Sequence, residues 1–174
     1  PLFEIYYDRI PSRAKLLGYA DKARQAVKTS RQLPLYRQLK ALDRSDFLWV
    51  DPAGGAFNER VVFEVGPYQA ISIPDLVFGE EGTVHLIDWK TGKKNDADRL
   101  QMEAGAIWGR FQPGMKENPV RARLVYLETG EVVDFEISEE DRQSASDKIR
   151  EDMEAMLGLL EDREANLPLP MEAF

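Results

Sequence analysis

The chain has 174 residues, 43% of them hydrophobic and 31% charged, with a formal net charge of −8. This length and composition predict one globular domain with a single core over residues 1–174. No apolar run approaches the ~18 residues of a membrane span, and no basic-then-apolar leader opens the chain, so we expect a cytoplasmic protein without a membrane partner. The absence of cysteine excludes disulfides, thiolate nucleophiles and a cysteine-held iron–sulfur cluster within these residues.

The charge is unevenly distributed along the chain. Residues 1–44 carry ten Lys and Arg against four Asp and Glu, whereas residues 131–174 carry four against fourteen. The basic end could face the phosphates of a nucleic acid, but two ordinary solvated helix surfaces would give the same pattern. Charge alone therefore leaves the class of partner open.

The first half of the chain predicts two helices followed by three strands. Apolar residues recur at helical spacing after the potential cap Ser12 (Leu16, Ala20, Ala23, Val27) and again after Pro34 (Leu35, Leu39, Leu42). The predicted strands are Val61–Val65, Tyr68–Phe78 and Thr83–Lys90. Gly79-Glu80-Glu81-Gly82 is short enough to join the last two as an antiparallel hairpin.

The second half predicts a helix, a hairpin and a long final helix. The first helix has Asn95 or Asp96 as its cap and an apolar stripe that we assign to the core (Leu100, Ala104, Ile107, Trp108, Phe111). Residues 123–127 and 132–137 form the hairpin. A capping box at Ser138 starts the final helix, whose core-facing residues are predicted as Ile149, Met153, Met156, Leu157 and Leu160. The fold class is α/β, with a central mixed sheet flanked by helices.

Three ionisable residues interrupt the two most apolar strands. Side chains alternate along a strand, so Asp88 and Lys90 share one face, and pairing with the preceding strand brings Asp75 within reach of it. Two carboxylates so placed offer hard oxygen ligands to Mg²⁺ or Mn²⁺, and a lysine beside them can offset charge on a phosphate or help deprotonate a water. A lone Asp-x-Lys is usually a surface ion pair, but burying an unpaired charge inside apolar strands is costly, so three ionisable groups that converge there suggest a functional role.

These residues resemble the motif of the PD-(D/E)XK nuclease superfamily, and within it the branch related to the RecB nuclease domain and Cas4. Pro74-Asp75 matches the first half of the motif, Asp88-Trp89-Lys90 the second half, and Thr91-Gly92 the tail common in that branch. Gln101 fits the glutamine that the branch carries early on the next helix. The branch has a tyrosine four residues further on, and Gly105 stands there instead. The resemblance covers about residues 59–137.

The resemblance implies a restriction-endonuclease-like core and a set of site residues. Asp75, Asp88 and the backbone carbonyl of Trp89 would be the metal ligands, with Lys90 as catalytic lysine and Gln101 beside them. Many relatives add an upstream glutamate, for which Glu64 or Glu59 is available, although Glu64 could equally be the polar member of an alternating strand. His85 lies on the motif strand rather than upstream, so we interpret it as structural.

Three cations follow the motif strand and are candidates for contacts with nucleic-acid phosphates: Lys93, Lys94 and Arg99. A solvated loop would have the same composition. Relatives in this branch often hold an iron–sulfur cluster in a cysteine-rich region after a segment such as residues 167–170, so the present chain is either a piece of a longer protein or a member without the cluster.

The sequence therefore predicts a Mg²⁺- or Mn²⁺-dependent nuclease that hydrolyses single- or double-stranded DNA. The resemblance implies a module in repair, recombination or defence, working with a helicase or another subunit or domain. The alternative is a nuclease-fold domain that binds nucleic acid or a partner protein without cutting.

Overall fold

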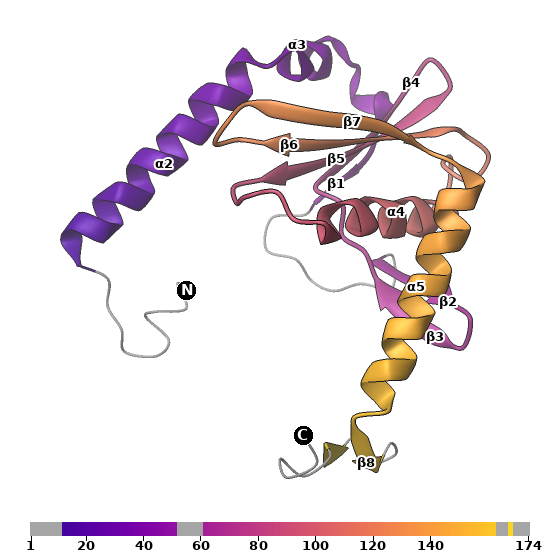
Figure 1. Cartoon of the computed structure of the whole chain (residues 1–174). Helices are drawn as coiled ribbons and strands as arrows, with labels where there is room; N and C mark the ends of the chain where they lie inside the picture. Colours follow the sequence, from indigo (N-terminus) through magenta and orange to yellow (C-terminus); the bar gives the residue numbers. More distant parts are fainter. Residues whose placement is uncertain (1–11, 52–60, 163–166, 169–174) are drawn as a thin grey trace.

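The computed structural model describes residues 12–51, 61–162 and 167–168. Its first half contains α2 (Arg13–Gln32), α3 (Pro34–Ala41), the short 3₁₀ helix η1 (Arg44–Asp46), β1 (Phe47–Val50), β2 (Val62–Val65), β3 (Tyr68–Ile71) and β4 (Leu76–Glu80). Its second half contains β5 (Thr83–Lys90), α4 (Ala97–Gly109), β6 (Val120–Tyr126), β7 (Glu131–Ile137), α5 (Glu139–Leu157), β8 (Leu160–Asp162) and β9 (Leu167–Pro168). The predicted α/β class with a central mixed sheet flanked by helices is confirmed, and this sheet has five strands (Figure 1).

The central sheet has the strand order β1-β4-β5-β6-β7, and β5 and β6 are its parallel pair. A parallel connection needs a crossover, which α4 supplies between these two strands. The hairpin of β4 and β5 turns at Glu81 and Gly82, which both have positive φ, 50° and 76°. A two-residue turn of this type matches the twist of the strands that it joins.

Helices cover both faces of the sheet. On one face α4 contributes Met102, Ala106 and Trp108 to a core shared with Leu86 and Leu124. On the other face Leu35 of α3 packs with Phe78, Ile87 and Val125. Leu86 and Ile87 are neighbours that belong to different cores, as strand alternation requires. Asp88 has the same parity as Leu86, so its side chain lies on the α4 face.

Several local predictions are confirmed. Ser12 accepts a hydrogen bond from the backbone N–H of Lys15, and Ser138 with Asp141 forms the predicted capping box. At the start of α4 the Asn95 side chain accepts from the backbone N–H of Ala97. Trp108 is fully buried, as predicted.

Other predictions are wrong, and in each case the tertiary packing explains the difference. The predicted strand over 68–78 is two strands in different sheets, because β3 pairs with β2 whereas β4 pairs with β1 and β5. Phe111 lies beyond the end of α4 and is 53% exposed rather than in the core. In α5 only Ala145 is fully buried, Ile149 packs against the core, and Met156 is 55% exposed because the end of this helix extends past the sheet (Figure 1).

None of the helices in the described part of the chain is both long and apolar enough to span a membrane.

Candidate active site

The backbone around Asp75 is held by the neighbouring strand β1. The indole N–H of Trp49 donates to the carbonyl of Pro74 at 2.9 Å, and the backbone N–H of Asp51 donates to the carbonyl of Asp75 at 2.9 Å. Pro74 has no backbone N–H to donate, and it lies two residues before β4 begins, where no ladder hydrogen bond is required. These contacts fix the backbone of Pro74 and Asp75 where the chain enters β4.

The register of the hairpin places the two aspartates opposite each other. Leu76 pairs with Ile87, so one step further along the antiparallel ladder Asp75 faces Asp88. Asp75 accepts a hydrogen bond from the backbone N–H of Trp89 at 2.7 Å. Asp88 is 6% exposed, and Asp75 is half-buried. The two aspartates thus lie at opposite positions of the hairpin, close enough for the charge of Asp88 to act on Asp75.

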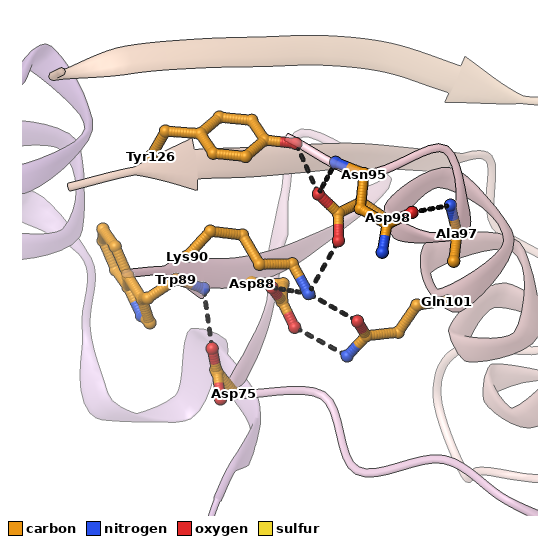
Figure 2. Close-up of polar contacts among 9 residues, drawn as sticks. All are labelled: Asp75, Asp88, Trp89, Lys90, Asn95, Ala97, Asp98, Gln101 and Tyr126. Atoms are coloured by element: carbon orange, nitrogen blue, oxygen red, sulfur yellow. Dashed lines mark hydrogen bonds and ion pairs between the residues drawn. The ribbon is translucent and has the colours of Figure 1, made fainter. Parts of the chain in front are cut away.

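Lys90 and Gln101 complete a ring of contacts with Asp88 (Figure 2). The Lys90 ammonium lies 2.9 Å from Oδ2 of Asp88 and donates to the side-chain oxygen of Gln101. The Gln101 amide nitrogen donates to Oδ1 of Asp88 at 2.9 Å. One amide thus contacts both charged groups. Its place early on α4, the helix that covers this face, allows it to do so.

Two further residues belong to the cluster and were missed by the sequence reasoning. Oδ1 of Asp98 lies 3.5 Å from the Lys90 ammonium, and its Oδ2 accepts from the Tyr126 hydroxyl at 2.8 Å and from the backbone N–H of Asn95 at 3.0 Å. Asp98 precedes Gln101 by one helical turn, a spacing that could have pointed to it. Tyr126 is paired with Lys90 in the parallel register of β5 and β6, and no local pattern reveals that pairing.

The cluster carries more negative than positive charge. The carboxylates of Asp88 and Asp98 contact one ammonium, that of Lys90, and the charge of Asp75 lies nearby without contacting it. Burial, with the nearby charge of Asp88, raises the pKa of Asp75 despite the hydrogen bond from Trp89. Burial alone would lower the pKa of Lys90, but the contacts with Asp88 and Asp98 outweigh it and raise that pKa. Lys90 is therefore a firmly protonated cation.

The outer pair, Asp98 and Tyr126, is fixed in one protonation state. Burial would raise the pKa of Asp98, but hydrogen bonds from Tyr126 and the Asn95 backbone, together with Lys90, lower it. Burial and the Asp98 carboxylate raise the pKa of Tyr126 to about 12. Tyr126 thus remains a hydrogen-bond donor and Asp98 an ionised acceptor at neutral pH.

The donor set fits a hard divalent cation in part. Oδ2 of Asp88 is buried and, apart from the ion pair with Lys90, has no aligned hydrogen-bond donor, so it retains lone pairs for a further partner. Asp75 occupies the backbone position opposite Asp88 and adds a second nearby carboxylate. Within the described residues, however, no three His, Cys, Asp or Glu side chains gather closely enough to hold a metal by themselves. Mg²⁺ commonly binds through one or two carboxylates and keeps several waters, so two aspartates are a sufficient protein contribution.

The remaining predicted residues are not all at the cluster. Glu64 is an exposed residue of β2, which pairs only with β3 in a second sheet, so the structure does not bring it to Asp75 or Asp88. Its alternation with buried Phe63 and Val65 accounts for it. Glu59 lies outside the described residues. His85 is buried and stacks on Phe78 with ring centroids 4.7 Å apart.

Of the three predicted phosphate-binding cations, two already have acidic partners. Lys94 pairs with Glu131 at 2.5 Å, and Arg99 pairs with Glu103 at 2.7 Å and Asp141 at 2.9 Å. Lys93 is exposed and makes no ion pair with a described residue. Only Lys93 is free to meet a phosphate without first breaking an ion pair.

Gly105 lies on α4, four residues after Gln101. It is buried, and a Cβ at this position would point toward the side chains of Leu86, Ser72 and Pro74 at 3.6 to 3.9 Å. A narrow crevice beside Asp88 and Gln101 is lined by these same residues. A larger side chain at position 105 would therefore enter this crevice.

Comparison of the sequence with protein-family models and with curated proteins found no match.

Proposed function

We propose that this protein is a metal-dependent nuclease that hydrolyses DNA phosphodiester bonds, with Asp75, Asp88 and Lys90 at its active site. The observation that carries the proposal is the cluster itself. The residues of the Pro-Asp and Asp-x-Lys motif support it: Asp75 and Asp88 lie at opposite positions of one hairpin, and the Lys90 ammonium contacts Asp88. The excess of carboxylates favours a divalent cation as the missing positive charge.

The fold is compatible with a restriction-endonuclease-like core, which we include in the proposal. The motif lies on the hairpin of β4 and β5, and the chain then crosses through α4 to β6, parallel to β5. The resemblance implies a central mixed sheet flanked by helices, and this arrangement agrees with it. The order and direction of these strands thus support the proposal independently of the side chains in the cluster.

The roles of the residues follow from their contacts. Asp75, Asp88 and the carbonyl of Trp89 would hold Mg²⁺ or Mn²⁺, which when bound polarises the phosphodiester and lowers the pKa of a water. Lys90 is protonated and offsets the negative charge that develops on the phosphate, which favours an electrostatic role over that of a general base. Gln101 orients Lys90 and Asp88 relative to each other through its two hydrogen bonds. Asp98, held by Tyr126, positions Lys90 from the far side.

The test is cleavage of single- and double-stranded DNA by the wild type, Asp88→Ala and Lys90→Ala, each with Mg²⁺, Mn²⁺ or EDTA. We expect cleavage only with metal and a loss of about a hundredfold or more in both variants. Asp134→Ala and Lys148→Ala serve as controls, because they remove the same kinds of charge away from the cluster.

If the wild type and both site variants bind DNA equally well and none of them cuts it with any metal, the nuclease proposal fails. The alternative, a nuclease-fold domain that binds without cutting, would then replace it.

A further inference from the structure

The helices α2 and α3 form the most basic part of the described chain. Residues 13–42 contain eight Lys and Arg against the single acid Asp21, in a protein whose net charge is −8. By contrast α5 carries seven Asp and Glu against three Lys and Arg. Positive charge is therefore gathered at one end of an otherwise acidic molecule.

Most of these cations lack acidic partners. Arg24 pairs with Asp21, and Lys15 lies over the ring of Tyr19. The other six are exposed and make no ion pair with any residue in the described ranges (Arg13, Lys22, Lys28, Arg31, Arg37, Lys40). Arginines on the sheet and near α5 behave differently: Arg110, Arg121, Arg123 and Arg142 each pair with an Asp or Glu. The positive charge of α2 and α3 is thus available to an outside partner.

The helix α2 is not part of the core. Its 20 residues include none that are buried, and it extends away from the sheet in Figure 1. Amphipathic packing is the usual source of helix stability, so a long helix with every residue at least partly exposed points to a role outside the core. Four of its cations fall on one stripe at 100° per residue (Arg13, Arg24, Lys28, Arg31).

The C-terminal end of α2 lies beside the turn between β6 and β7, in the sheet that carries the candidate active site. A Cβ added to Gly130 would lie 3.2 Å from the side chain of Thr29 near the end of α2. Gly130 is in the turn that follows Tyr126, and Tyr126 is the register partner of Lys90. The C-terminal end of α2 therefore lies near the end of β5 and β6 at which Lys90, Asp98 and Tyr126 meet, and the rest of the helix extends away from it.

We propose that the basic stripe of α2 binds the phosphate backbone of the nucleic-acid substrate beyond the point of cleavage. This inference rests on the proposed function and adds where the substrate runs. A helix of 20 residues is about 30 Å long, comparable to about nine base pairs at 3.4 Å each. Contacts of this kind are electrostatic and independent of base sequence. The stripe supplies affinity, while the cluster at Asp75, Asp88 and Lys90 supplies the chemistry.

The test uses the salt dependence of DNA binding, measured by fluorescence anisotropy in EDTA so that no cleavage occurs. The arm variant, named for the helix α2 that extends away from the sheet, carries Arg24→Gln, Lys28→Gln and Arg31→Gln. The matched control carries Lys116→Gln, Lys148→Gln and Arg150→Gln, three exposed or half-exposed cations away from α2. Both variants change the net charge equally. Circular dichroism checks that each is folded, which we expect because no residue of α2 is buried.

We expect the arm variant to bind DNA on the order of tenfold or more weakly at 0.1 M salt, with a slope of log K against log salt that is smaller by about 2 to 3. The control should keep the wild-type slope to within one. An arm variant with the affinity and slope of wild type, a loss no larger than that of the control, or a wild type that binds no DNA at low salt would overturn the proposal. The first of these outcomes would assign the helix, with exposed Leu17 and Val27, to a protein partner instead.

Cleavage measured separately with Mn²⁺ distinguishes the two proposals. A wild type that binds DNA through α2 but does not cut it contradicts the nuclease proposal and supports DNA binding by α2. A wild type that cuts DNA, together with an arm variant that binds DNA as well as the wild type does, contradicts only the proposed role of α2.

Discussion

The two ends of strand β5 carry polar clusters of opposite character. Near its start, on the α3 face, the residues His85, Glu80, Arg121, Arg123 and Asp134 meet. Arg121 and Arg123 both contact Asp134, at 2.6 and 3.1 Å, and Gln38 of α3 bridges Arg123 to Glu80. Near its end, on the α4 face, Asp88 and Asp98 contact the one ammonium of Lys90, and the carboxylate of Asp75 lies nearby. Cations and acids balance at the first end, and acids are in excess at the second.

The difference shows which property marks a candidate site. Both clusters contain charged residues on an apolar strand, so the presence of charge does not separate them. A balanced network satisfies its own members and can dock an element, as the Gln38 contacts dock α3. A cluster with uncompensated carboxylates is less stable by itself and gains from a further cation. Substitutions at the two ends of β5 test this contrast.

The largest effect is expected for Asp75→Asn. Cleavage should fall about a hundredfold or more, because one of two carboxylates that would hold the metal is gone. The metal-free protein should unfold at the same or a higher temperature, because burial and Asp88 raise the pKa of Asp75, so its charged form disfavours the folded state at neutral pH. Cleavage rates with Mn²⁺ and thermal unfolding in EDTA measure both. A variant that loses stability together with activity would make Asp75 a structural residue.

A smaller effect is expected for Tyr126→Phe. It removes the hydrogen bond to Asp98 and leaves Lys90 less firmly held, so we expect about a tenfold lower kcat with little change in KM for DNA. The loss of one hydrogen bond should cost about 1 kcal/mol of unfolding free energy. Tyr36→Phe is the control, since its side chain is exposed on α3. An unchanged kcat would show that Asp98 needs no support from Tyr126.

At the balanced end, Asp134→Asn should affect stability and not cleavage. It weakens the contacts of both arginines, and because Asp134 is partly exposed the expected cost is about 1 kcal/mol of unfolding free energy. Chemical denaturation measures the loss, and the cleavage rate serves as its control. If cleavage fell as well, the separation of the two clusters would be wrong.

The smallest effect is expected for the pH dependence contributed by His85. Burial, together with Arg123, lowers the pKa of His85, so the unfolded state binds the proton more readily than the folded state does. Its contribution to stability is complete above the unfolded pKa near 6.5 and is lost as the pH falls toward the folded pKa. Between pH 7 and pH 5 the stability of His85→Leu should therefore fall less steeply. The difference in slope should be a fraction of the ~1.4 kcal/mol per pH unit that one proton gives. Parallel slopes would contradict this assignment.

Much of the local structure could be predicted because its causes lie in adjacent residues. The alternation of side chains along β5 correctly predicted that Asp88 and Lys90 lie on one face of the sheet. The capping residues Ser12 and Ser138 correctly predicted where two helices begin. The hairpin turn at Gly82 correctly brought Asp75 opposite Asp88. The pair of aspartates and its lysine were thus already specified by short-range pattern.

What the sequence determined by itself is the motif, its strands and the face on which its charges lie, since alternation and turn chemistry act over a few residues. The tertiary structure decided the rest. It split residues 68–78 between two sheets, kept Glu64 away from the cluster and left Phe111 exposed. It also brought Asp98 and Tyr126 to Lys90 across the α4 crossover. These outcomes depend on strand register and helix packing between segments distant in sequence, and no local period encodes them.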